Sequence, residues 1–195
     1  MSRPKKCKSC GKEFNPSRPL QQVCGFRCAV KLQKAKEKAK EKAKKEKMRE
    51  NVLSRLDYVK ILQRLINKIV RDIDFGSLCI CCKQQFDKLD AGHFYPVSTH
   101  PHIRFHLFNL WGQSRYCNSY KHGNLHQYTS SLFEMNLLEF IMDEATQWRD
   151  LELSKEDLKR AIKAAKTIKI EPKQRTIEQR IELRKLINEQ IGIYA

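Results

Sequence analysis

The stretch from Cys79 to Asn124 reads CICCKQQFDKLDAGHFYPVSTHPHIRFHLFNLWGQSRYCNSYKHGN and contains most of the chain's reactive side chains. A cysteine pair comes first, then a histidine three residues before a proline, then an asparagine, and finally the string Cys-Asn-x-x-Lys. Paired cysteines are typical of structural zinc sites, and carboxylate and amide oxygens suit a harder cation. The stretch therefore predicts a small metal-dependent site on a zinc-braced hairpin and helix.

The composition limits the size of the hydrophobic core. The chain has 195 residues, of which 41% are hydrophobic and 31% are charged. That length suits one ordinary domain or two to three small modules. Because the apolar share is low, small parts of the chain are expected to need metal ions as cross-links.

The charge of the chain is strongly uneven. The formal net charge is +17, and residues 1–50 hold 17 Lys or Arg against five Asp or Glu. Such an excess favours a polyanionic partner, since each phosphate contact releases condensed counterions. A membrane surface is the competing polyanion, but the basic run lacks the Trp, Phe and Leu face of an interfacial helix. We therefore expect nucleic acid, and no membrane, as the partner.

The eight cysteines are expected to be reduced. No apolar run approaches the ~18 residues of a membrane span, and the first residues, MSRPKKC, lack the apolar core of a secretory signal. In a reducing cytosol, paired cysteines indicate metal more than disulfides. Cys7, Cys10, Cys24 and Cys28 have the spacing C-x2-C-x13-C-x3-C, which predicts a tetrahedral structural zinc. Free buried thiols are the alternative, which so polar a segment disfavours.

Helical patterns flank the central stretch. Residues 31–50 form a Lys/Ala/Glu run with only a thin apolar stripe, which predicts a long solvated helix. Apolar residues at three- and four-residue steps predict a core-facing helix over 52–73. Further helices are expected at 131–150, 154–168 and 175–191. The predicted parts are a four-Cys zinc finger (1–30), a Lys-rich helix or linker (31–50), a helix with the core that carries the central stretch (51–130) and a helical region (131–195).

Taken together, these features resemble one group of phage proteins. The order of His93, Asn109 and Asn118 behind a cysteine pair resembles the HNH (His-Me finger) nucleases, in which a hairpin and a helix hold one divalent ion. More narrowly, the strings DAGHFY, IRF, CN and KHGN, with the four-Cys finger and the Lys-rich helix, resemble the NinG (Rap) recombination proteins of lambdoid phages. The resemblance covers essentially the whole chain, is dense at 79–124 and is weak towards the C-terminus.

The resemblance implies roles for four residues. Phosphodiester hydrolysis needs a base to activate water and a cation to stabilise the charge on the phosphate. His93 would be the base, with Asn109 holding its ring or its strand. Asp90 and Asn118 offer hard oxygen ligands for Mg²⁺ or Mn²⁺. As alternatives, Asp90 caps a turn before Gly92 and Asn118 is a turn residue.

Other side chains are assigned by charge or size. Arg104, Arg115 and Lys121 are expected to contact phosphates. Trp111 and Tyr116 are expected in the core rather than as stacking platforms for bases. Trp111 also departs from the family pattern, which often has histidine at this position.

The central cysteines are one partner short of a zinc site. The second zinc knuckle of the family corresponds here to Cys79, Cys82 and Cys117. Ser114 stands where a fourth cysteine belongs, and a hydroxyl is a poor zinc ligand beside three thiolates. Either Cys81 or His106 supplies the fourth ligand, or the knuckle has lost its zinc and its thiols pack as small apolar groups.

The predicted fold is α+β and predominantly helical. A small zinc-braced ββα-metal (HNH-like) core, with a hairpin near 88–96 and a helix near 115–122, would be flanked by helices and preceded by the zinc finger. The predicted function is a phage or prophage recombination endonuclease that hydrolyses DNA. Its preference for branched structures such as Holliday junctions and flaps comes from the resemblance alone. It would act in the cytoplasm of the bacterial host with Mg²⁺ or Mn²⁺ and one or two zinc ions.

Two rival functions stay open. One is a non-catalytic, zinc-dependent DNA- or RNA-binding accessory protein of recombination, for which the basic N-terminal region and the four-Cys finger would suffice. In the other, the Lys-rich helix is an arm that associates with RNA or the ribosome. A homodimer and contacts with other phage or host recombination proteins are open as well, and no heptad pattern argues for a dimer.

Overall fold

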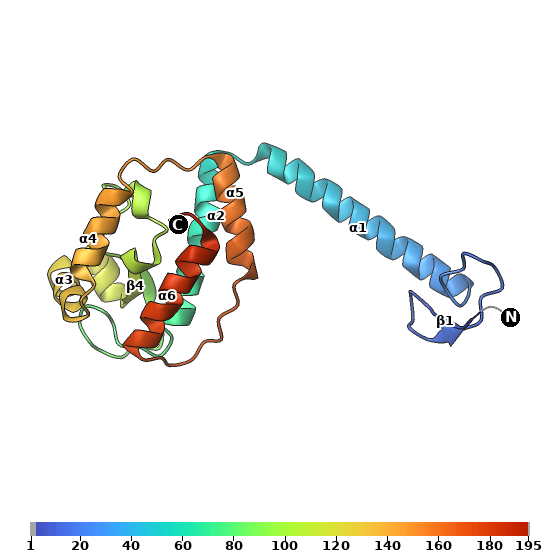
Figure 1. Ribbon diagram of the computed structural model, residues 1–195, viewed down its shortest axis with the longest axis horizontal. Coiled ribbons are helices and arrows are strands. Elements are labelled where there is room, and N and C mark those ends of the chain that lie inside the picture. Colours follow the sequence, from blue (N-terminus) through green and yellow to red (C-terminus); the bar gives the residue numbers. More distant parts are fainter. Residues whose placement is uncertain (1–2, 195) are drawn as a thin grey trace. The chain divides into compact units, whose positions relative to one another are not determined.

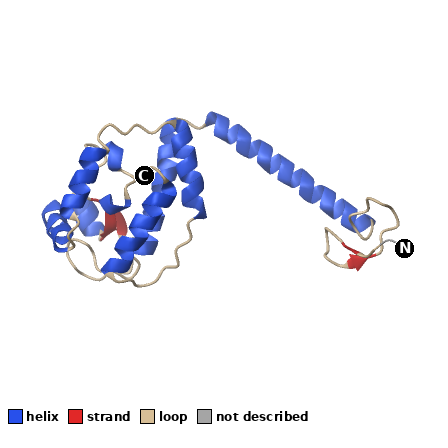
Figure 2. Ribbon diagram, viewed as in Figure 1, coloured by secondary structure: helices blue, strands red, loops and turns tan. Residues whose placement is uncertain are grey.

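The computed structural model describes residues 3–194 of the chain, and their contacts group into two units that divide between Leu53 and Ser54. Helices predominate, with two small two-stranded sheets (Figure 2). The expected α+β, mostly helical class is confirmed. No helix of the described residues is long and apolar enough to cross a membrane. The four-part division expected from composition stays a prediction.

The first unit is a finger followed by a long helix. Strands β1 (Lys5–Lys6) and β2 (Glu13–Phe14) pair antiparallel. Between them, Gly11 has a φ of 74°, in the left-handed region that glycine adopts without a steric penalty. Helix α1 (Phe26–Val52) follows, so the last finger cysteine, Cys28, lies in its first turn.

Helix α1 is exposed along most of its length. Its side chains from Lys31 to Glu46 are exposed except for the half-buried Leu32. This agrees with the expectation of a solvated helix, because alanine and lysine stabilise a helix through their intrinsic propensity without a core face.

Three capped helices build the scaffold of the second unit. They are α2 (Arg55–Ile73), α5 (Lys155–Thr167) and α6 (Ile177–Ile191). Each begins with a capping box, in which a Ser or Thr hydroxyl and the side chain three residues later satisfy two backbone N–H groups. Helix α2 packs against α5, and α5 against α6 (Figure 1). The helices predicted at 52–73, 154–168 and 175–191 are confirmed.

The single helix predicted at 131–150 is wrong. Two shorter helices occupy this region, α3 (Leu125–Glu134) and α4 (Leu138–Gln147). Asn136 between them has a φ of 55°, a left-handed conformation that asparagine tolerates better than most residues. That conformation ends α3 and lets α4 fold back against it.

The hairpin predicted near 88–96 is also wrong, because its two strands are far apart in sequence. Strand β3 (Asp90–His93) pairs antiparallel with β4 (Leu110–Gln113), with His93 opposite Leu110. The connection contains the short 3-10 helices η1 (Pro101–Ile103) and η2 (Leu107–Asn109). The helix expected at 115–122 is a five-residue π-helix, η3 (Tyr116–Tyr120).

A buried ion pair joins α2, β4 and α6. Asp74 directly follows α2, and its Oδ2 accepts hydrogen bonds from the Gly112 amide at 2.6 Å and from Arg184 Nη2 at 2.7 Å. Both charged side chains are fully buried. Arg184 also donates to the carbonyls of Leu107 at 3.2 Å and Leu110 at 3.1 Å. The guanidinium and carboxylate are therefore satisfied largely by backbone groups around β4.

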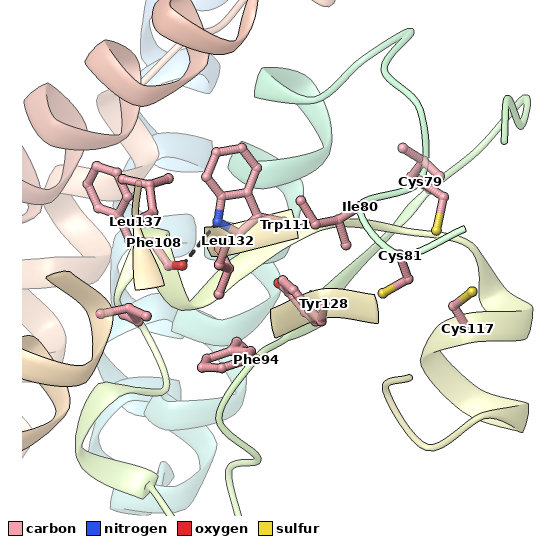
Figure 3. Packing of buried hydrophobic residues seen from close by; sticks show 12 residues of the cluster. Cys79, Ile80, Cys81, Phe94, Phe108, Trp111, Cys117, Tyr128, Leu132 and Leu137 are labelled. Atoms are coloured by element: carbon pink, nitrogen blue, oxygen red, sulfur yellow. Dashed lines mark hydrogen bonds between the residues drawn. The ribbon is translucent and has the colours of Figure 1, made fainter. Parts of the chain in front are cut away.

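Trp111 lies in the core, as predicted, and beneath this ion pair. Arg184 Cζ lies 3.7 Å from the centre of its ring, a cation–π contact. Its indole Nε1 donates to the Phe108 carbonyl at 3.0 Å, the dashed line in Figure 3. Around it pack buried residues of several elements, among them Tyr128 and Leu132 of α3 (Figure 3). The residue at position 111 therefore has a structural role in this chain.

Replacement of Arg184 by leucine is expected to destabilise the second unit by about 3–5 kcal/mol, because the buried Asp74 carboxylate then keeps only its longer contact with Arg180, at 3.4 Å. Urea unfolding followed by tryptophan fluorescence measures this, since both tryptophans, Trp111 and Trp148, lie in this unit. The control is Arg64→Leu at an exposed position of α2, which should change stability by no more than about 0.5 kcal/mol. Equal losses in the two variants would contradict the role of the pair.

Candidate functional site

The finger brings its four predicted cysteine ligands together. The sulfur atoms of Cys7, Cys10, Cys24 and Cys28 all lie within 4.8 Å of one another. The Cys10–Cys24 and Cys24–Cys28 sulfur pairs are 3.6 and 3.5 Å apart. Four sulfurs at the usual Zn–S distance of about 2.3 Å would sit about 3.8 Å apart in a tetrahedron. The residues present therefore fit a structural zinc ion.

The central cysteines also meet, as a group of three. The sulfurs of Cys79, Cys82 and Cys117 lie within 4.8 Å of one another. Figure 3 shows those of Cys79 and Cys117 converging at one end of the buried cluster. The Ser114 amide donates to Cys79 Sγ at 3.2 Å, and Ser114 Oγ accepts from the Cys117 amide at 3.2 Å. Three cysteine sulfurs are thus in place, and the hydroxyl of Ser114 is beside them.

Neither candidate for the fourth ligand joins this group. His106 is buried elsewhere, with its Nε2 3.0 Å from Glu144 Oε2, so its assignment is wrong. Cys81 accepts a hydrogen bond from Gln113 Nε2 at 2.9 Å and lies outside the cluster of three. A hydrogen bond with Cys81 lowers the pKa of Cys79 to about 3, and the same bond raises the pKa of Cys81. Cys81 therefore stays a protonated thiol beside the Cys79 thiolate.

His93 ends β3 and has one ring nitrogen fixed by the backbone. Its Nε2 lies 3.0 Å from the Arg104 carbonyl oxygen. A carbonyl only accepts, so Nε2 carries the hydrogen and Nδ1 keeps its lone pair. Burial lowers the pKa of His93 below its ordinary value of 6.5; the bond to the Arg104 carbonyl raises it and the Arg104 charge lowers it. The ring is thus a neutral base at neutral pH.

Asn109 holds the connection after His93 rather than its ring. Its side-chain Oδ1 accepts from the Tyr95 amide at 2.8 Å, and its Nδ2 donates to the carbonyls of Tyr95 at 3.3 Å and Ile103 at 3.2 Å. The side chain is fully buried. Of the two roles expected for Asn109, the structure gives it contacts with the chain next to the strand, and it bonds both ends of the segment 95–103.

The two predicted oxygen ligands come from different elements, Asp90 from β3 and Asn118 from η3. Side chains alternate along a strand, so Asp90 and His93 point to opposite faces of the two-stranded β3–β4 sheet. Asp90 shares its face with Gln113, the residue opposite it on β4. Asn118 lies half-buried in η3. Within residues 3–194, the clusters of three or more Cys, His, Asp or Glu ligands are the two cysteine groups. The sequence could have shown that Asp90 and His93 face opposite ways if residues 90–93 had been predicted as one strand, because side chains alternate along a strand.

The predicted phosphate contacts differ in their surroundings. Arg115 and Lys121 are exposed at the two ends of η3, whereas Arg104 is half-buried and its Nε donates to Gln63 Oε1 at 3.2 Å. Tyr116, expected in the core, is 58% exposed, and that expectation is wrong. Its ring stacks with Tyr120, with centroids 6.1 Å apart, and Lys121 Nζ lies 5.2 Å from its centre. The wide π-helical turn exposes both rings, which spacing alone did not indicate.

Comparison with known proteins identifies the family. The family model described as "Bacteriophage Lambda NinG protein" matches residues 1–179. The chain belongs to the NinG family. Among curated relatives, "Protein ninG" of Salmonella phage P22 is 33% identical over 78 residues, which are 40% of this chain and 38% of that protein. "Protein ninG" of Escherichia phage lambda is 33% identical over 76 residues, 38% of this chain and 37% of that protein.

These alignments cover less than two fifths of either NinG relative. No solved structure matches the chain. The predicted resemblance to NinG is confirmed, while the predicted resemblance to HNH nucleases is not tested by these matches.

Replacement of Ser114 by cysteine is expected to give this NinG protein a fourth thiolate at the central group. Zinc release from that group to a chelator should slow by roughly tenfold or more, since loss of even an outer-shell partner costs about that much affinity. A colorimetric zinc assay on the full chain measures the rate. The control Ser130→Cys adds a cysteine at an exposed position of α3 and should leave the rate of zinc release unchanged. Identical release from wild type and both variants would mean that the central cysteines hold no zinc.

Proposed function

We propose that this protein is a phage recombination endonuclease that hydrolyses DNA with a divalent metal ion. The observation that carries the proposal is the fixed, partly buried His93, whose Nε2 is bound to the Arg104 carbonyl and whose Nδ1 is available as a base. A base must be neutral to accept a proton, and the lowered pKa keeps the ring neutral at physiological pH. Its role would be to take a proton from the attacking water.

The order of elements supports the same chemistry. Strands β3 and β4 form an antiparallel ribbon that η3 follows directly, the order expected of an HNH-like core. Asp90 and Asn118 would hold the divalent ion, which when bound would stabilise negative charge on the phosphate and the leaving oxygen. Because Asp90 and His93 face opposite ways along β3, the proposal requires the ion to lie towards η3 and the water to approach His93 from the strand end.

The net positive charge and the NinG family together support DNA as the substrate. The net charge of +17 favours DNA, and Arg104, Arg115 and Lys121 would contact its phosphates. Membership of the NinG family supports a role in phage recombination in the host cytoplasm, where branched structures such as Holliday junctions and flaps are the intermediates to be cut. A homodimer would allow two cuts in one junction.

Replacement of His93 by glutamine is expected to lower Mg²⁺-dependent nicking of a labelled four-way junction by roughly 10²–10⁴-fold, the usual contribution of a general base. Glutamine keeps an N–H donor for the Arg104 carbonyl, so the fold should persist, and thermal unfolding checks that it does. His126→Gln, at an exposed position of α3, should cut as wild type. Equal cutting by wild type and His93→Gln would remove His93 as the base.

A second candidate is a non-catalytic, zinc-dependent nucleic-acid-binding protein of recombination. The observation that favours it is the separation of Asp90 from His93 on opposite faces of β3. The four-Cys finger and the Lys-rich helix α1 would then carry binding, to DNA or to RNA. If the protein binds a junction tightly and in a salt-sensitive way but does not cut it in Mg²⁺ or Mn²⁺, the non-catalytic binding function is favoured.

A further inference from the structure

A cationic cavity lies next to the backbone partner of His93. It has a volume of about 530 Å³ and is lined by Arg55 at the start of α2, by His102 and Arg104, and by Arg149 after α4. We call these four residues and the space between them the cationic cavity. Three arginines from three separate parts of the second unit therefore converge on one space.

The arginines of this cavity outnumber its carboxylates, three to two, and hydrogen-bond neutral acceptors instead. Arg55 Nε donates to the Leu153 carbonyl at 2.8 Å, and Arg104 Nε donates to the Gln63 amide oxygen at 3.2 Å; both acceptors are neutral. Asp150 and Glu152 also line the cavity. Among the ion pairs of the described residues, none joins a carboxylate to Arg55, Arg104 or Arg149. Guanidinium groups that gather at one cavity without a carboxylate partner favour an anionic ligand.

A second cavity, of about 570 Å³, adjoins the first and shares His102 and Arg149 with it. Tyr95 and His100 line it, with ring centroids 4.4 Å apart. Burial lowers the pKa of His100, and the charges of His102 and Arg149 lower it further, so its ring is neutral beside them. Neutral aromatic rings next to arginines suit a nucleobase and its phosphate.

We propose that the two cavities together bind an unpaired nucleotide of a DNA strand. Its phosphate lies in the cationic cavity between Arg55, Arg104 and Arg149, and its base lies against Tyr95 and His100. A cavity of about 570 Å³ falls within the ~300–1,000 Å³ range of small-ligand sites, large enough for one base. A base inside a duplex is already stacked on its neighbours and would not enter, so the site selects single-stranded or frayed DNA.

This inference deepens the proposed function and rests on it for the identity of the strand as DNA. His93 Nε2 bonds the main chain of Arg104, whose side chain lines the cationic cavity. A strand whose unpaired nucleotide occupies the cavities therefore runs beside the proposed base. The two cavities supply the proposed endonuclease with a way to recognise the unpaired nucleotides found at flaps and at the centre of opened junctions.

The test measures binding without cutting. The probes are a fluorescently labelled single-stranded oligothymidine and a blunt duplex of the same length, titrated by anisotropy with the full chain in buffer without added divalent ion. Arg149→Gln removes a phosphate contact and Tyr95→Leu removes a stacking ring. Each should weaken single-strand binding on the order of tenfold and weaken duplex binding far less. Arg149 is exposed, so its replacement should leave the fold intact.

The charge-matched control is Arg64→Gln, which removes one exposed arginine of α2 that does not line either cavity. It should weaken binding to both probes slightly and equally. The inference is overturned if Arg149→Gln behaves as Arg64→Gln does, or if it weakens duplex and single strand alike. Because no cutting is involved, these results stand whether or not His93→Gln abolishes cleavage.

Discussion

The ion pair between Asp74 and Arg184 joins the elements on which the candidate site is built. Asp74 ends α2, Arg184 lies on α6, and together they hydrogen-bond backbone groups of Leu107, Leu110 and Gly112 in and before β4. A buried charge without a partner costs several kcal/mol. The packing of α2, α6 and the β3–β4 pair against one another is therefore needed to keep both charges satisfied. A Cβ at Gly112 would press on Asp74 and Leu89, which explains a glycine in the middle of a strand. Because β4 is fixed in this way, it can fix β3 and His93.

The opposite face of the ribbon is held by polar contacts towards the cysteines. A Cβ at Gly92 would collide with the amide of Gln113, and the Tyr128 hydroxyl donates to the Gly92 carbonyl at 3.0 Å. Gln113 in turn donates to Cys81, which follows Cys79 by two residues and forms a side-chain hydrogen bond with it. The central cysteine group and the ribbon are therefore mechanically connected. Zinc bound to Cys79, Cys82 and Cys117 would make this side of the β3–β4 pair more rigid without contacting His93.

Local signals in the sequence predicted the parts of this fold that depend on neighbours along the chain. Apolar periodicity and capping residues placed α2, α5 and α6, and cysteine spacing placed both thiol groups. The β3–β4 pairing was missed because it joins strands separated by a long connection, and no local turn signal marks it. The pairing of Asp74 with Arg184 depends on packing across most of the second unit. Spacing also could not show that Asn109 would hold the connection, or that η3 would expose Tyr116. The arginines of the cationic cavity come from three distant segments and carry no motif.

We propose that His93, held by the Arg104 carbonyl, acts as the base of a metal-dependent DNA cut. A base works only when unprotonated, and the pKa of His93 is lowered below 6.5, so cutting should be lost only as the pH falls through that lower value. The most direct measurement is the single-turnover rate of junction cleavage by the full chain as a function of pH, at saturating Mg²⁺. We expect an acid limb with its midpoint below pH 6.5 that is absent from the residual activity of His93→Gln. A limb that persists in His93→Gln, or no Mg²⁺-dependent cleavage at any pH, would contradict it.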